Sequence, residues 1–396
     1  MGRMAGGRGR SGTGTRVAPP DRMAPQRPKE KRTVRYAVVG LGHIAQVAVL
    51  PAFDHAENSE LAALVSSDST KLKTLSRRHG VETAVAYDQF AELCASGTID
   101  AAYIALPNHL HREYTEIAAN AGIHVLCEKP MALTTKDAEA MIRTCARNGV
   151  RLMIAYRLHF ERANLEAVDI VSSGTIGEPR FFSSDFSLDV KAGDIRVRRE
   201  TGGGALWDLG IYCVNAARYL FQAEPLEAVA FTAARDDERF REVEEMLGAI
   251  LRFPGERLAH FTCSLGAADL ATYRVVGTKG DLVLNPAYEY AIELERELTV
   301  GGKKSHKKFP KRDQFAPELV TFSDCVLEGR DPEPSGEEGL LDVRVIEALY
   351  RSARTGKAVE LSPREKGQRP TLDQEMRRPP VSPKPKEVKA KPPSRG

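Results

Sequence analysis

Cysteine and tryptophan are scarce in this chain of 396 residues, which has six cysteines and one tryptophan. The cysteines are scattered without any Cys-x-x-Cys pair, at Cys94, Cys127, Cys145, Cys213, Cys263 and Cys325. This spacing argues against a zinc site and against a disulfide framework, and it fits a reducing compartment. We therefore expect a cytoplasmic protein.

Long hydrophobic runs and several catalytic motifs are also absent. No apolar stretch approaches the length of a membrane span, and no apolar signal segment follows the arginines near residue 1, so we expect no membrane. No G-x-S-x-G occurs, and no cysteine has a nearby histidine in a recognisable nucleophile motif. His109 and His111 are two residues apart but lack a third ligand nearby, so no metal site is predicted.

The net charge of +3 is distributed unevenly along the chain. Residues 1–33 have nine Lys and Arg against two Asp and Glu, and residues 362–396 have ten against four. Both tails are rich in proline and poor in apolar residues, so we expect them to be disordered. Residues 34–361 have 38 basic against 48 acidic residues, and this net negative charge makes nucleic acid an unexpected partner.

The folded part is predicted to begin with a dinucleotide-binding motif. A strand over 35–39 precedes a G-x-G-x-x-A sequence and a helix-like run to His55; the motif's candidate phosphate contacts are Gly40, Leu41, Gly42, His43 and Ile44. The first glycine permits the tight turn, and the second lets the backbone approach a pyrophosphate. The N–H groups of the following helix then face the phosphates.

Strands and helices alternate from there to residue 156. Expected strands cover 61–65, a short segment ending near Tyr87, 100–105, 124–127 and 151–155, with helices between them. Asp or Asn before the helices and Gly after them fit helix capping, with Asp68 and Asn108 as two of the expected caps. We predict a Rossmann domain with a doubly wound parallel sheet over 34–156.

The end of the second strand indicates the cofactor. NAD-binding proteins usually have an acidic residue there, which binds the ribose 2′-OH. Here Ser66 occupies that place and Lys71 follows five residues later. A hydroxyl and an ammonium suit a 2′-phosphate, so NADP is favoured over NAD.

The second half, residues 157–361, has a different pattern. A helix over 164–172 is followed by strands over 179–190, 228–233, 246–253, 258–265, 272–276, 282–284 and 291–294, with a helix over 205–221 between the first two strands. Helices over 317–327 and 336–352 complete it. Strands joined by short turns predict an α+β domain with a large, mostly antiparallel open sheet. Its open face is a natural surface for a homodimer or homotetramer.

Two segments contain residues suited to proton transfer. The strand 124–127 ends abruptly in Glu128, Lys129 and Pro130, which places the lysine at the carboxyl edge of the sheet, where such folds bind ligands. In the helix over 205–221, Asp208 and Tyr212 are four residues apart and so share one face. Taken alone, each segment has an ordinary structural interpretation, as a solvated loop and as an acidic first helical turn with a packing tyrosine.

Five separated segments together resemble the glucose–fructose oxidoreductase/inositol dehydrogenase (Gfo/Idh/MocA) family, closest to its glucose–fructose oxidoreductase branch. They are G-L-G-H-I-A, L-P-N-H-L-H-R-E-Y, H-V-L-C-E-K-P-M-A, A-Y-R-L-H-F and G-G-G-A-L-W-D-L-G-I-Y-C-V-N-A-A-R-Y-L. The resemblance covers about residues 34–361 and implies Lys129, Asp208 and Tyr212 as catalytic residues. It also implies cofactor contacts near the nicotinamide, at Leu106, Pro107, Asn108, His111, Glu128, Lys129 and Arg157, with Tyr87 and Arg196 as weaker candidates.

This resemblance predicts an NADP-dependent sugar oxidoreductase that transfers hydride between a sugar or polyol carbon and the nicotinamide. A free phenol is a poor base at neutral pH, and a neighbouring ammonium favours its ionised form. We therefore expect Tyr212 to be the acid/base, helped by Lys129, with Asp208 orienting the lysine or a sugar hydroxyl. The alternatives are a non-catalytic, nucleotide-sensing regulator of the same fold and an NADP-dependent D-xylose or dihydrodiol dehydrogenase.

Overall fold

The computed structural model describes residues 32–364 and 367–394. Most of the N-terminal tail that we predict to be disordered therefore lies outside the described residues. Among those that are described, no helix is long and apolar enough to cross a membrane.

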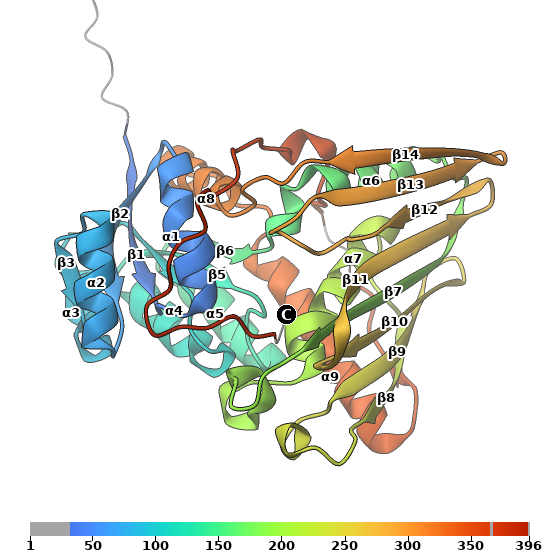
Figure 1. Cartoon of the computed structure of the whole chain (residues 1–396), viewed down its shortest axis with the longest axis horizontal. Coiled ribbons are helices and arrows are strands. Elements are labelled where there is room, and N and C mark those ends of the chain that lie inside the picture. The colour runs from blue at the N-terminus through green and yellow to red at the C-terminus, as the bar shows by residue number, and fades with distance from the viewer. Residues whose placement is uncertain (1–31, 365–366, 395–396) are drawn as a thin grey trace, which may run out of the picture. The chain divides into compact units, whose positions relative to one another are not determined.

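The first half forms a parallel six-stranded sheet, shown in blue and cyan in Figure 1. Its strands are β1 (Val34–Val39), β2 (Ser59–Val65), β3 (Thr83–Val85), β4 (Ala101–Ile104), β5 (His124–Glu128) and β6 (Leu152–Ala155). They lie in the order β3-β2-β1-β4-β5-β6, and every neighbouring pair is parallel. This order, in which the strand sequence reverses beside β1, confirms the predicted Rossmann sheet.

Helices connect these strands and cover both faces of the sheet. The first begins at Ala45–Val49 and continues through α1 (Leu50–Ala52) and Phe53–His55; the others are α2 (Ser69–His79), α3 (Phe90–Ala95), α4 (His111–Asn120) and α5 (Thr135–Arg147). Asp68 caps α2 as predicted, because its carboxylate accepts from the N–H groups of Thr70 and Lys71. Gly80 ends α2 with a φ of +67°, the left-handed conformation that glycine adopts without strain.

The residues of each central strand alternate between two hydrophobic cores. In β1, Ala37 and Val39 face one core while Tyr36 and Val38 face the other, and all four are fully buried. This period of two with both faces apolar is expected for a parallel sheet between helical layers. It leaves only the strand ends free to bind a ligand.

The second half forms a nine-stranded sheet, green to orange in Figure 1. Its strands are β7 (Pro179–Asp189), β8 (Glu227–Ala233), β9 (Met246–Phe253), β10 (Arg257–Ser264), β11 (Gly266–Gly277), β12 (Gly280–Leu284), β13 (Leu294–Val300), β14 (Lys303–Phe309) and β15 (Val359–Glu360). All neighbours are antiparallel except β7 and β10. The predicted mostly antiparallel sheet is therefore confirmed.

One edge of this sheet differs from the sequence prediction. The pattern predicts a final strand over 291–294, whereas β13 begins at Leu294 and pairs with β14, which is not predicted. The sequence of β14 has four lysines among seven residues, so no apolar alternation marks it. Its cations pair with β13 across the ladder, as in Lys304 with Glu297 at 2.9 Å, and a charged edge strand protects a sheet from further pairing.

The helices of the second half join the two sheets. They are α6 (Arg162–Ser172), α7 (Ile211–Phe221), α8 (Ala316–Glu328) and α9 (Gly336–Thr355). Helix α8 belongs to the second half in sequence but packs on the first sheet, where Ser323 Oγ lies 2.8 Å from Tyr36 Oη and the carbonyl of Val320 accepts from Asn58. Burial of one face of the first sheet thus depends on a helix whose Ser323 is 287 positions beyond Tyr36.

The C-terminal segment differs from the expectation of disorder. Residues 367–394 follow an extended path along the surface, dark red in Figure 1, where they pass beside α1 and end near the centre of the view. Basic residues of the tail pair with the acidic body: Arg378 lies 2.8 Å from Glu57, and Arg369 lies 2.8 Å from Glu224. Opposite charge on the folded body thus adds to the apolar contacts that Met376 and Val388 make with the core.

Candidate active site

The loop after β1 has the geometry that a pyrophosphate requires. Gly40 has a φ of +98°, and a Cβ on it would lie 2.5 Å from the carbonyl oxygen of Ala105, so only glycine fits. A Cβ on Gly42 would meet no atom within 4 Å, which leaves the space over this residue open. The residues present therefore fit a dinucleotide whose phosphates approach the backbone here.

The other predicted members of this loop have different surroundings. Leu41 is buried in the core, whereas His43 and Ile44 are partly exposed. His43 Nδ1 lies 2.8 Å from the carboxylate of Glu387 in the C-terminal segment. Gln46, which sequence reasoning missed, has an almost completely buried side chain that donates to the carbonyl of Leu41 and so supports the loop.

The end of β2 holds the residues predicted to select the cofactor. Ser66 is buried, and its hydroxyl accepts from the N–H of Asp68 at 3.2 Å. Asp68 turns its carboxylate to the start of α2, while Lys71 is partly exposed one turn further on. No carboxylate is thus committed to a ribose 2′-OH at the position after the strand, in keeping with a 2′-phosphate site.

Lys129, Asp208 and Tyr212 converge, although 79 and 83 positions separate the lysine from the other two. Lys129 Nζ donates to the carbonyl of Asp208 at 2.9 Å and lies 3.6 Å from its carboxylate. The same nitrogen lies 4.5 Å from the centroid of the Tyr212 ring. Asp208 belongs to a π-helical turn, Leu206–Gly210, which precedes α7; Tyr212 follows as the second residue of that helix.

Arg196 brings a second cation to this group. Its Nε donates to Asp208 at 2.7 Å, so the carboxylate lies between a guanidinium and an ammonium. Burial alone would raise the pKa of Asp208, but Arg196 and Lys129 together lower it below its ordinary value. Asp208 is therefore ionised at neutral pH and fixes the positions of both cations.

Arg157 lies against the phenol side of Tyr212. Its Nη2 is 3.4 Å from the hydroxyl of Tyr212, and its guanidinium carbon is 5.2 Å from the ring centroid. The guanidinium is also held by the side chain of Gln314 and the carbonyl of Tyr288. Phe186 and Tyr288 pack on the tyrosine ring, so the phenol is oriented by aromatic contacts and flanked by two cations.

The Leu-Pro-Asn loop after β4 is tied to its neighbours by two side chains. His111 is fully buried, with Nδ1 2.8 Å from the carbonyl of Pro130 and Nε2 2.9 Å from that of Leu106. Burial lowers the pKa of this imidazole. His111 therefore joins this loop to the Glu-Lys-Pro loop, which differs from the direct cofactor contact implied by the resemblance.

Asn108 also has a different partner from the one predicted. The sequence places it as a helix cap, but no side-chain cap is present at that turn, and its amide donates to the carbonyl of Gly202 at 2.8 Å. This bond links the first half to the loop before α7. Leu106 lies against Gly40, and Pro107 is partly exposed beside it.

Glu128 and Tyr87 complete the predicted set. Glu128 accepts from the hydroxyl of Tyr103 at 2.9 Å, and burial raises its pKa. Glu318, a buried residue of α8 that the sequence does not single out, lies close enough to Glu128 that burial and this neighbour together raise its pKa well above the ordinary value. Tyr87 is half-buried beside β3, where its ring contacts Tyr114 edge to face.

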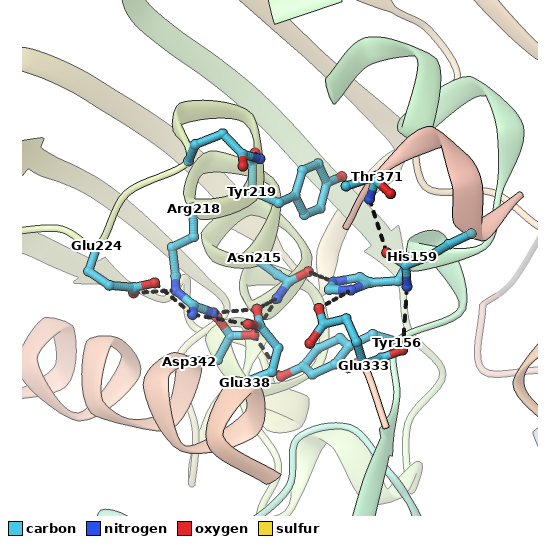
Figure 2. A network of polar contacts seen from close by, with 12 residues as sticks. Tyr156, His159, Asn215, Arg218, Tyr219, Glu224, Glu333, Glu338, Asp342 and Thr371 are labelled. Atoms are coloured by element: carbon cyan, nitrogen blue, oxygen red, sulfur yellow. Dashed lines mark hydrogen bonds and ion pairs between the residues drawn. The ribbon is translucent and has the colours of Figure 1, made fainter. Parts of the chain in front are cut away.

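A buried polar network stabilises the position of α7 (Figure 2). Arg218, which is completely buried, donates to Glu224 at 2.6 Å and to Glu338 at 2.8 Å, and also to Asp342. Asn215, one turn after Tyr212, donates to Glu338 at 2.7 Å and to Asp342 at 2.9 Å. Helix α7 is thereby fixed to α9.

The network continues toward the first half through two aromatic residues. Tyr156 donates to Asp342 at 2.6 Å, and its ring stacks on His159. His159 Nε2 in turn lies 3.0 Å from Asn215 Oδ1. Asn215 also lines a small cavity together with Lys129 and Tyr212, so this network reaches the candidate site directly.

Comparisons with known proteins agree with this geometry. A model of the oxidoreductase family with an NAD-binding Rossmann fold matches residues 34–156, and a model of the GFO/IDH/MocA C-terminal domain matches residues 164–283. The chain belongs to the Gfo/Idh/MocA oxidoreductase family. The resemblance predicted from the sequence is therefore confirmed.

Similar proteins of this family act on sugars. The chain is 35% identical over 336 residues to D-xylose 1-dehydrogenase (NADP(+)) of Haloarcula marismortui, covering 83% of this chain and 93% of that one. It is 40% identical to the aldose-aldose oxidoreductase of Caulobacter crescentus, solved with glycerol, with a TM-score of 0.80 over 83% of this chain and all of that one. A 3-ketoreductase from Actinomadura kijaniata, solved with NADP and TDP-benzene, is 29% identical with a TM-score of 0.75, covering 81% and 98%.

Proposed function

We propose that this protein is an NADP-dependent oxidoreductase that oxidises the carbinol of an aldose, or reduces the corresponding carbonyl. The observation that carries the proposal is the convergence of Lys129, Asp208 and Tyr212 beside a glycine loop open to a dinucleotide. The names of the similar D-xylose dehydrogenase and aldose-aldose oxidoreductase support a sugar substrate. This convergence favours an enzyme over a regulator that only senses nucleotide.

NADP is the proposed cofactor, with its pyrophosphate over Gly42 and its 2′-phosphate near Ser66 and Lys71. The absence of a free carboxylate after β2 supports this assignment, because an acidic residue would repel the phosphate. The NADP named for the dehydrogenase and the ketoreductase supports it as well. NADP⁺ held at this site would supply the acceptor for the hydride that the sugar carbon loses.

The side chains of the site supply proton transfer and orientation. Tyr212 takes the proton of the sugar hydroxyl as the C–H bond breaks, and it returns that proton in the reverse direction. Lys129 and Arg157, both close to the ring, stabilise the negative charge that forms on the phenol oxygen. Asp208 is a positioning residue, because its carboxylate fixes Lys129 and Arg196.

A test of this assignment is a panel of aldoses with NADP⁺ and NAD⁺, followed at the nicotinamide absorbance band. Tyr212→Phe should lower kcat by about 10²- to 10⁴-fold, the usual contribution of one general acid–base group. Fluorescence titration with NADPH should give an unchanged dissociation constant, since the phenol hydroxyl is not needed for nucleotide binding. Tyr114→Phe, the same chemical change on α4, should leave kcat unchanged. Full turnover by Tyr212→Phe would remove the tyrosine from the mechanism.

We also propose that the protein forms a homo-oligomer through the open sheet, and that it is cytoplasmic. Large apolar side chains are exposed on five strands of this sheet, namely Phe181, Phe231, Ile250, Leu258 and Leu270, and Phe231 is 75% exposed. Such a patch supports an interface. The six cysteines, all unpaired, support a reducing compartment. Sedimentation of the wild type and of Phe231→Glu tests the interface, since the variant should shift toward monomer.

A further inference from the structure

The C-terminal segment lies along the edge of the glycine loop. Gln46 pairs with Val388 in both directions: its amide donates to the Val388 carbonyl at 3.0 Å, and its oxygen accepts from the Val388 N–H at 2.7 Å. The Val388 side chain also packs against the hydrophobic core on that face of the first sheet. These contacts anchor the segment directly to the start of the helix that faces the phosphates.

The neighbouring residues of the segment reach the end of β2, where the 2′-phosphate is proposed to bind. Lys389 Nζ lies 3.1 Å from the carboxylate of Asp68, the residue two positions beyond Ser66. Arg78 of α2 donates to the carbonyl of Lys386 at 2.7 Å. The segment therefore brings a lysine to the end of β2, where the proposed 2′-phosphate needs positive charge.

The far end of the segment is held by the second half of the chain. Lys191 donates from its backbone to the carbonyl of Pro393 at 3.0 Å, and Val190 forms a β-bridge with Ser394. Pro393 is four positions beyond Lys389, a span of at most about 14 Å for an extended chain. The segment thus links the start of the first helix to the second half of the chain, beside the proposed dinucleotide site.

Two observations indicate that the segment covers a bound dinucleotide and does not replace it. The space over Gly42 remains open although the segment is in place. Residues 384–391 contain four lysines and one glutamate, Glu387, which pairs with His43, and the net positive charge of this stretch attracts phosphates.

We propose that residues 386–394 form a clasp across the dinucleotide groove, which slows the release of NADP, and that Lys389 adds to the preference for the 2′-phosphate. This inference rests on the proposed NADP site. It makes the C-terminal segment, which no catalytic motif includes, a determinant of cofactor affinity and specificity.

The specificity is tested by equilibrium fluorescence titration of Lys389→Gln with NADPH and NADH. The ratio of the two affinities should fall about 3- to 10-fold relative to the wild type, the range of a partly exposed charge-assisted contact. Lys391→Gln removes the same charge two residues away and should leave the ratio within about twofold. An equal effect of both variants, or of neither, would overturn the role of Lys389.

The clasp itself is tested by the rate of NADPH release and by amide hydrogen exchange. Val388→Pro removes the N–H that binds Gln46, and stopped-flow release of NADPH should become about tenfold faster or more. In the full-length wild type, saturating NADP should slow hydrogen exchange at the Val388 amide. Faster exchange would mean that the segment competes with the nucleotide, and the proposal would fail. If the wild type bound no NADPH, the proposed cofactor itself would be wrong.

Discussion

The nucleotide loop and the catalytic helix reach the same site by different structural means. Gly40 and Gly42 act through the backbone directly after β1, in a turn that the sequence marks with its own glycines. Helix α7 is held instead by Arg218 and Asn215, whose partners come from α9 more than 100 positions away. One end of the site is a local motif, whereas the other depends on a buried set of charges.

This difference predicts which changes affect activity, stability or both. A local loop that contacts only the ligand should tolerate a substitution without unfolding, unless the new Cβ atom clashes with the backbone of another segment. A buried charge network should lose stability when one member is removed, because the remaining charges stay buried without partners. Four substitution experiments separate these behaviours, and they follow in order of expected effect.

Lys129→Met should produce the largest change, confined to activity. Removal of the ammonium from beside the Tyr212 ring should lower kcat by about 10³-fold, within the range of 10²- to 10⁴-fold for one acid–base component. Lys136→Met, an exposed lysine at the start of α5, is the matched control and should keep full activity. Initial rates with the preferred aldose measure both. Comparable rates in the two variants would contradict the role of Lys129.

Arg218→Met should produce the largest loss of stability. It leaves Glu224, Glu338 and Asp342 buried around an apolar side chain, a change that costs about 3–5 kcal/mol of unfolding free energy. Urea denaturation followed by circular dichroism measures it. Arg241→Met breaks an exposed pair with Glu238 and should change the same quantity by less than about 1 kcal/mol.

Gly40→Ala and Gly42→Ala should separate stability from binding within one loop. The first places a Cβ against the Ala105 carbonyl at a φ of +98°, so it should lower the unfolding free energy by about 1–3 kcal/mol. The second meets open space and should leave stability almost unchanged while weakening NADPH binding. Thermal denaturation and fluorescence titration of both variants provide the comparison. Equal losses of stability would show that Gly42 is not reserved for the ligand.

The last prediction is a pH dependence within the charge network, which is small for each pH unit. Burial raises the pKa of Asp342 from its ordinary value to about 6, with Glu338 adding to the rise and Arg218 opposing it. The folded state then binds this proton more tightly than the unfolded chain, so the group's contribution to stability falls as pH rises between about 4 and 6. The slope is at most about 1.4 kcal/mol per pH unit.

Asp342→Asn isolates the contribution of this carboxyl group to the pH dependence of stability, because the amide does not titrate. The unfolding free energy of the wild type minus that of the variant should decrease across this pH range. Asp236→Asn, an exposed aspartate, should give a difference that is flat with pH. A flat difference for Asp342→Asn as well would mean that the carboxyl stays ionised.

The sequence predicted the first sheet well because its signals are local. Glycine after the helices, Asp68 before α2 and apolar strands of four to seven residues are each readable within a few positions. Asn108 shows where this approach fails, since its side chain binds Gly202, 94 positions away, in place of the helix start. The lysine-rich strand β14 was missed for a related reason, because its stability comes from its neighbour in the sheet.

The C-terminal segment is a further case in which contacts with distant residues could not be predicted from the local sequence. Its composition resembles that of a disordered chain, and nothing in residues 367–394 alone indicates an ordered path. The ordering contacts are supplied by Gln46, Asp68 and Lys191, which belong to distant parts of the chain. Charge complementarity between the basic tail and the acidic body is visible in the sequence, but the place where they meet is not.

The sequence by itself determined the Rossmann fold and the family, and it predicted the three candidate catalytic residues Lys129, Asp208 and Tyr212. Each of these is marked by short-range patterns or by motifs. Tertiary structure alone decided that Arg196 and Lys129 share the Asp208 carboxylate, that α8 packs on the first sheet and that the C-terminal segment contacts both Gln46 and Val190. These features depend on pairings between residues far apart in the chain. Such pairings are chosen by the packing of the whole molecule, and no local preference for helix, strand or turn specifies them.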